Sequence, residues 1–146
     1  MEQNRKHLKI SSVIVLVLAA VTFLRVAGEF LFGDWGTTML PDGLSENFVL
    51  AARIVLAVIT FALLAPQIYM GIKGLRIAKN PVSTKGHIVW AAILFVLAIL
   101  SLIDPATAIV QNINLLDNAI ALISGVLSSA SYFYYLWFAN AVAKEN

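Results

Sequence analysis

Cysteine is absent from this sequence, which excludes disulfide bonds, thiol nucleophiles and thiolate metal ligands. Charged residues are scarce as well: they make up 12% of the 146 residues, whereas 60% are hydrophobic and the mean hydropathy is +0.87. A chain with so few polar side chains cannot cover a folded surface in water, so we expect it to lie in a lipid bilayer. On so little polar surface, a net charge of +2 does not indicate a nucleic-acid partner.

Long apolar stretches are abundant, and four of them reach the roughly 20 residues that a helix needs to cross a bilayer core of about 30 Å. The sequence therefore predicts an all-α polytopic membrane protein, a single four-transmembrane-helix bundle over residues 1–146. The predicted spans are residues 9–32, 46–78, 84–103 and 114–143, with a short outer-surface helix over 105–112 as an option. The first span follows basic residues, as in a signal peptide, but no small-residue cleavage site closes it before Arg25, so we expect it to be retained.

Capping and breaking residues mark the ends of the predicted spans. Ser45 is expected to cap the second span because its hydroxyl can accept a hydrogen bond from the first turn. Asp104 precedes Pro105, which predicts that the third span ends there and that Asp104 acts as a cap. Asn114 is expected to cap the fourth span in the same way. Pro66 lies inside the second span, where it removes one backbone hydrogen bond and predicts a kink.

The distribution of basic residues predicts the orientation of the chain in the membrane. Lys and Arg collect in the short loops on the cytoplasmic side, and the central loop of this chain carries Lys73, Arg76, Lys79 and Lys85. The other basic residues at the ends assigned to the cytoplasm are Arg5, Lys6, Lys9 and Lys144. The two opposite loops contain neither Lys nor Arg. We therefore expect both termini in the cytoplasm and a multi-pass protein of a bacterial-type plasma membrane.

Ionisable residues inside the spans indicate a polar cluster in the outer third of the bundle, because unpaired charge is costly in hydrocarbon. Its expected members are Arg25, Glu29, Arg53, Asp104 and Asp117. In one interpretation the cluster is structural: Arg25 pairs with Glu29, Arg53 pairs with Asp117, and Asp104 is a cap. The alternative is a water-filled vestibule that binds an ion or a small solute.

Two further sets of residues extend this pattern. Thr22, Thr60 and Gln67 could continue a polar path through the membrane from the charged cluster. Pro66-Gln67 resembles the residue pair of the PQ-loop transporters, but four spans without a repeat depart from their three-helix unit, and no role is carried over. Small residues recur on one face of the fourth span, which predicts a helix-packing face against another span or a second copy. They are Ser124, Gly125, Ser128 and Ser131.

The two histidines, His7 and His87, are both predicted at the cytoplasmic ends of spans, as solvated side chains rather than haem ligands. The intramembrane acids belong to the opposite surface, so no histidine can act as general base beside them. Ser124 and Ser128 would need such a base to become nucleophiles. The sequence therefore predicts no enzyme, no cofactor and no metal site.

The function expected from small size and short loops is a non-enzymatic accessory, regulatory or immunity-like partner of another membrane component. The alternative is a small solute or ion transporter or channel that uses the outward-facing polar cluster. The expected partners are the lipid bilayer and either another membrane protein or a second copy of this chain.

Overall fold

The computed structural model describes residues 2–32, 43–82 and 84–145, and for residue 29 it describes the backbone alone. The described chain is helical, with helices α1 (Glu2–Phe32), α2 (Glu46–Lys79), α3 (Gly86–Leu100), α4 (Ile103–Val110) and α5 (Leu115–Lys144). Helices α3 and α4 follow each other across a single turn and together form one apolar segment, Gly86–Val110. With this segment counted once, four helices are long and apolar enough to cross a membrane, which confirms that part of the sequence prediction.

Of the two helix caps predicted at Ser45 and Asp104, only the one at Ser45 is found. Ser45 is the N-cap of α2 and its hydroxyl accepts a hydrogen bond from the Phe48 amide at 3.4 Å, as predicted. The predicted cap at Asp104 is wrong: Leu102 is the N-cap of α4 and makes no side-chain cap bond. Asp104 instead lies in the first turn of α4, where its carboxylate is favoured by the positive end of the helix dipole.

The start of α5 also differs from its prediction. Asn114 is the N-cap but makes no side-chain cap bond, because its backbone is left-handed with a φ of 40°. Asparagine is one of the few residues that tolerates this conformation. The side-chain amide of Asn118 holds the preceding turn instead, since its Nδ2 donates to the carbonyl oxygens of Ile113 at 2.9 Å and Asn114 at 3.2 Å.

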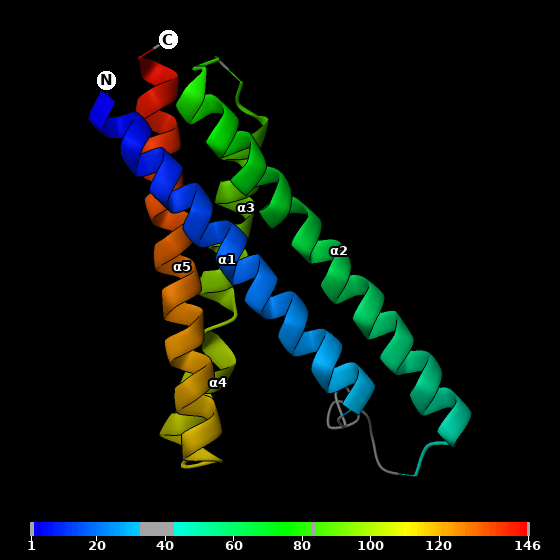
Figure 1. The fold of residues 1–146 in the computed structure, drawn as a ribbon. Helices are drawn as coiled ribbons and strands as arrows, with labels where there is room; N and C mark the ends of the chain where they lie inside the picture. Colours follow the sequence, from blue (N-terminus) through cyan, green and yellow to red (C-terminus); the bar gives the residue numbers. More distant parts are fainter. Residues whose placement is uncertain (1, 33–42, 83, 146) are drawn as a thin grey trace.

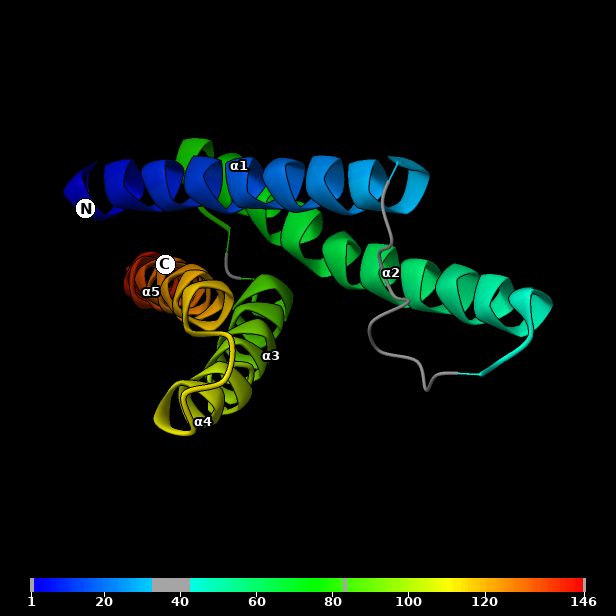
Figure 2. The same ribbon diagram turned by 90° about the horizontal axis from the view of Figure 1, so that it is seen from below.

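The helices converge at one end of the molecule and diverge at the other (Figure 1). We call the closed end the one where Glu2, Lys79, Gly86 and Lys144 lie, and the open end the one where Phe32, Glu46, Val110 and Leu115 lie. Helix α1 packs along α2 and also contacts α5, while α3 and α4 pack against α5. Towards the open end the α1–α2 pair separates from the α3–α4–α5 group in both views (Figures 1 and 2).

The hydrophobic core lies mainly in the half of the molecule near the closed end. Its buried members come from α1, α2, α3 and α5: Leu8, Val15, Met70, Ile77, Ala91, Leu94, Ala98, Tyr132, Tyr135, Ala139 and Val142. The chain termini are joined there as well, since Asn4 Nδ2 donates to Glu145 Oε1 at 2.6 Å. Buried contacts at this end therefore hold the helices together, and the open end is left to diverge.

Candidate functional site

The divergence of α1 from α5 leaves a groove between them, which we call the α1–α5 groove. It has a cavity volume of about 310 Å³ and is lined by Leu18, Val21, Thr22 and Arg25 from α1 and by Ile120, Ile123, Ser124, Leu127 and Ser128 from α5. These positions recur every three or four residues, so each set forms one face of its helix. The groove is apolar on most of its surface and carries three hydroxyl groups and one guanidinium.

A second hollow continues the α1–α5 groove towards the open end. It has a volume of about 300 Å³ and is lined by Arg25, Asp117, Ile120 and Ala121. Arg25 and Ile120 line both hollows, so the two form one continuous surface. The structure thus brings together two members of the predicted polar cluster, Arg25 and Asp117, which carry opposite charges.

The other members of the predicted cluster lie elsewhere. Arg53 Nη2 donates to the Phe30 carbonyl at 3.0 Å, and its guanidinium lies 5.5 Å from the centre of the Phe30 ring. Arg53 therefore links α2 to α1. The predicted pairing of Arg53 with Asp117 is not found, because the first part of α2 and the start of α5 are far apart in both views (Figures 1 and 2). Asp104 is exposed on α4. The side chain of Glu29 lies outside the described residues.

The predicted polar path is divided between two regions. Thr22 lines the α1–α5 groove, whereas Thr60 and Gln67 belong to α2 and are not among the lining residues. The hydroxyl of Thr60 donates to the Leu56 carbonyl of its own helix at 2.9 Å. Gln67 is half-buried, and its Oε1 has no hydrogen-bond partner among the described residues. These three side chains do not share one cavity.

The small residues of α5 face two directions. Ser124 and Ser128 line the α1–α5 groove, whereas a Cβ added at Gly125 would overlap the Leu102 side chain. Gly125 therefore packs against the turn between α3 and α4. Ser131 lies one turn further on, and its hydroxyl donates to the Leu127 carbonyl at 2.7 Å. Ser129, which the residue pattern did not single out, is buried and donates to the Gly125 carbonyl at 2.8 Å.

The closed end is basic. The central loop residues Lys73, Arg76, Lys79 and Lys85 lie in the last turns of α2 and just before α3. Lys79 also lines a hollow of about 650 Å³ with residues from the start of α1. The other residues that line this hollow are Glu2, Arg5, Lys6, Lys9 and Ala78. This concentration of cations has no counterpart among the residues that line the α1–α5 groove.

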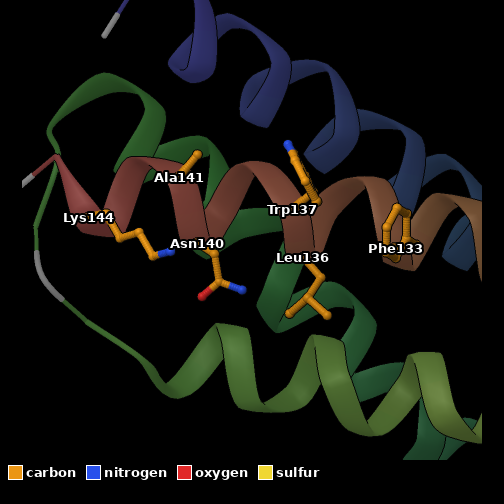
Figure 3. A pocket seen from close by; sticks show the side chains of 6 residues that line it. All are labelled: Phe133, Leu136, Trp137, Asn140, Ala141 and Lys144. Atoms are coloured by element: carbon orange, nitrogen blue, oxygen red, sulfur yellow. The ribbon is translucent and has the colours of Figure 1, made fainter.

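Another hollow, of about 490 Å³, lies on α5 near the closed end (Figure 3). All of its lining residues belong to α5: Phe133, Leu136, Trp137, Asn140, Ala141 and Lys144. The aromatic and aliphatic side chains make most of this surface, and Lys144 is its only charged group. A hollow lined by one helix brings no distant parts of the chain together, so we do not regard it as a functional site.

The two histidines differ in burial, and His87 is less exposed than predicted. His87 is 1% exposed and packs edge-on against Tyr135, with 6.0 Å between the ring centres. Its ring nitrogens have no hydrogen-bond partner within the described ranges. His7 is half-buried, stacks on Phe138 at 4.6 Å and contacts the Tyr134 hydroxyl through Nδ1 at 2.5 Å. The prediction of a solvated side chain is therefore wrong for His87, which is buried on an aromatic residue of α5, whereas His7 keeps part of its surface exposed beside Glu2, Gln3 and Lys6.

Among the described residues, no group of three or more histidine or acidic side chains is placed to hold a metal ion. Comparisons of the chain with protein-family models, with curated proteins and with solved structures found no match in any of the three. The class that the fold defines is thus an all-helical chain with four helices able to cross a membrane. Its candidate site is the α1–α5 groove with Arg25 and Asp117 at one end.

Proposed function

We propose that this chain is a non-enzymatic protein of a bacterial-type plasma membrane and acts as an accessory, regulatory or immunity-like partner of another membrane component. It spans the membrane four times with both termini in the cytoplasm, so the closed end lies at the cytoplasmic face and the open end at the outer face. The basic residues at the closed end, which include Lys73, Arg76 and Lys79, support this orientation.

The α1–α5 groove is the observation that supports a binding role. It lies between two helices within the apolar part of the chain, and the described side chains leave about 310 Å³ of it unfilled. Helices that pack closely along their whole length leave no hollow of this size between them. A hollow that opens sideways from the bundle is accessible to molecules in the same membrane, and its apolar walls favour an apolar occupant.

A photoreactive amino acid placed at Leu127 tests this role in native membranes. Leu127 lines the groove and is 59% exposed, so a bound component lies within reach of the probe. We expect irradiation to give one discrete cross-linked product, resolved by mass spectrometry of the purified full-length chain.

Val126 is the matched control for this experiment. It is adjacent to Leu127 in α5 and is 51% exposed, but it is not among the residues that line the groove. The same probe at Val126 is expected to give only a broad mixture of bulk lipid products. If Leu127 gives the same mixture as Val126, the groove binds no specific component and the proposal fails.

A second function, a small solute or ion transporter or channel, is favoured by one observation, the opposite charges of Arg25 and Asp117 in one hollow. Liposomes that contain the purified chain alone distinguish the two functions, with a pH-sensitive dye and a potential-sensitive dye as reporters. An accessory protein causes no ion movement in this assay. Ion movement by the natural chain that Asp117→Asn abolishes would favour the transporter and contradict the accessory role.

A further inference from the structure

We propose that the α1–α5 groove binds a glycerophospholipid whose headgroup carries both a phosphate and a primary amine. The phosphate lies at Arg25, the ammonium lies at Asp117, and an acyl chain lies along the apolar wall of the groove. This inference rests on the proposed function, because it identifies the membrane component that the groove receives.

The charges at the open end of the groove are complementary to such a headgroup. Arg25 and Asp117 share a hollow of about 300 Å³ with Ile120 and Ala121, and both charged side chains are exposed to it. A guanidinium presents several donors in a planar fork that matches phosphate oxygens. A carboxylate accepts hydrogen bonds from an ammonium. A purely anionic headgroup would pair its phosphate with Arg25 but would bring no cation for the Asp117 carboxylate.

The rest of the groove fits the glycerol esters and an acyl chain of the same lipid. Thr22 lies about one turn below Arg25 in α1, and Ser124 and Ser128 face it from α5. Their hydroxyl groups can donate to the ester oxygens of a glycerolipid. Leu18 lies one turn further from Arg25 in α1, and Leu127 lies beside Ser128 in α5; both provide apolar surface for an acyl chain. The charged pair at the open end is thus followed by a stretch that mixes hydroxyl and apolar side chains, which suits the esters and acyl chains of the same lipid.

The depth of Arg25 agrees with this arrangement. It precedes the last residue of α1, Phe32, by seven positions, which is roughly 10 Å along the helix axis at 1.5 Å per residue. An arginine at that depth can extend its guanidinium towards the headgroup region. A phospholipid of this kind carries both a phosphate for Arg25 and an ammonium for Asp117 in one headgroup.

Native mass spectrometry of the full chain in mild detergent tests the proposal with three phospholipids of identical acyl chains. Phosphatidylethanolamine has the primary amine, phosphatidylcholine has a quaternary amine that donates no hydrogen bond, and phosphatidylglycerol has no cation. We expect the Kd for phosphatidylethanolamine to be about tenfold lower than for the other two, as the loss of one charge-assisted hydrogen bond predicts.

Two substitutions separate the roles of the charges. Asp117→Asn is expected to abolish the preference for phosphatidylethanolamine over phosphatidylglycerol, and Arg25→Gln to weaken both by about tenfold. Arg76→Gln is the control, because Arg76 is an exposed cation near the closed end and its loss leaves the preference unchanged. Equal Kd values for the three lipids, or a preference that persists in Asp117→Asn, would overturn the proposal.

Leu127→Trp keeps the test decisive if a charge variant fails to fold. The larger ring fills the groove without changing either charge, so binding of phosphatidylethanolamine is expected to fall about tenfold, and unchanged binding contradicts the proposal.

The cross-linking experiment at Leu127 distinguishes failure of the lipid proposal from failure of the accessory function. Capture of a protein at Leu127 would retain the accessory function and reject the lipid, whereas the absence of any discrete product rejects both.

Discussion

At the scale of single residues, two glycines determine how closely the helices approach near the closed end. A Cβ at Gly74 would overlap the Ser12 hydroxyl and the Tyr135 ring, and one at Gly71 would overlap the Leu16 side chain. Glycine at such positions lets backbones approach. The Tyr135 hydroxyl donates to the Met70 carbonyl at 2.8 Å, so the close approach also joins α5 to α2.

Replacing Gly74 by alanine is expected to destabilise the protein. The added methyl group must displace buried atoms of α1 and α5, an overpacking that costs about 1–3 kcal/mol. Thermal unfolding in detergent, followed by circular dichroism, measures the change. Gly28→Ala is the matched control in α1, because a Cβ there meets nothing within 4 Å. If the two variants unfold at the same temperature, the packing at Gly74 is not as tight as described.

The burial of His87 could have been predicted from the spacing of residues along α3, although its place beside the basic loop suggested a solvated side chain. Its position directly after the basic loop indicates a solvated histidine at an interface. The buried residues of α3 are His87, Ala91, Leu94 and Ala98, which recur at intervals of three and four and therefore share one face. This periodicity was present in the sequence and could have placed His87 in the core.

At the scale of elements, the spans were predictable and their arrangement was not. Length and composition are sufficient to predict four membrane-length helices, and Ser45 was recognisable as a cap. The partners of Arg53 depend on how far α2 diverges from α5, which no local pattern encodes. The same is true of the α1–α5 groove, because hydrophobic periodicity identifies a face but not the face that it meets.

Arg53 provides a test of the contact between α1 and α2. Arg53→Ala removes the hydrogen bond to the Phe30 carbonyl and the contact with its ring. We expect the free energy of unfolding to fall by about 2 kcal/mol, since hydrogen bonds of charged groups contribute about 1.5–3 kcal/mol. Arg76→Ala, an exposed position on the same helix, is expected to change it by no more than about 0.5 kcal/mol. Urea denaturation in mixed micelles measures both, and equal losses would contradict the role of Arg53.

At the scale of the whole molecule, the two ends differ in packing and in charge. The closed end combines the buried core with the basic residues, while the open end exposes large apolar side chains such as Leu24, Phe32 and Leu116, which are 69%, 91% and 74% exposed. An apolar surface of this extent is not stable in water and indicates contact with lipid or with a partner. A membrane orientation with the basic end inside accounts for both features.

The most direct test of this orientation uses the natural absence of cysteine, which makes any introduced cysteine the only thiol in the chain. Lys85→Cys lies at the closed end and Asn112→Cys at the open end, and both native residues are exposed. In intact cells, a membrane-impermeant maleimide is expected to label Asn112→Cys alone, and Lys85→Cys only after the cells are permeabilised. Labelling of both positions from the same side would contradict four spans with a cytoplasmic closed end.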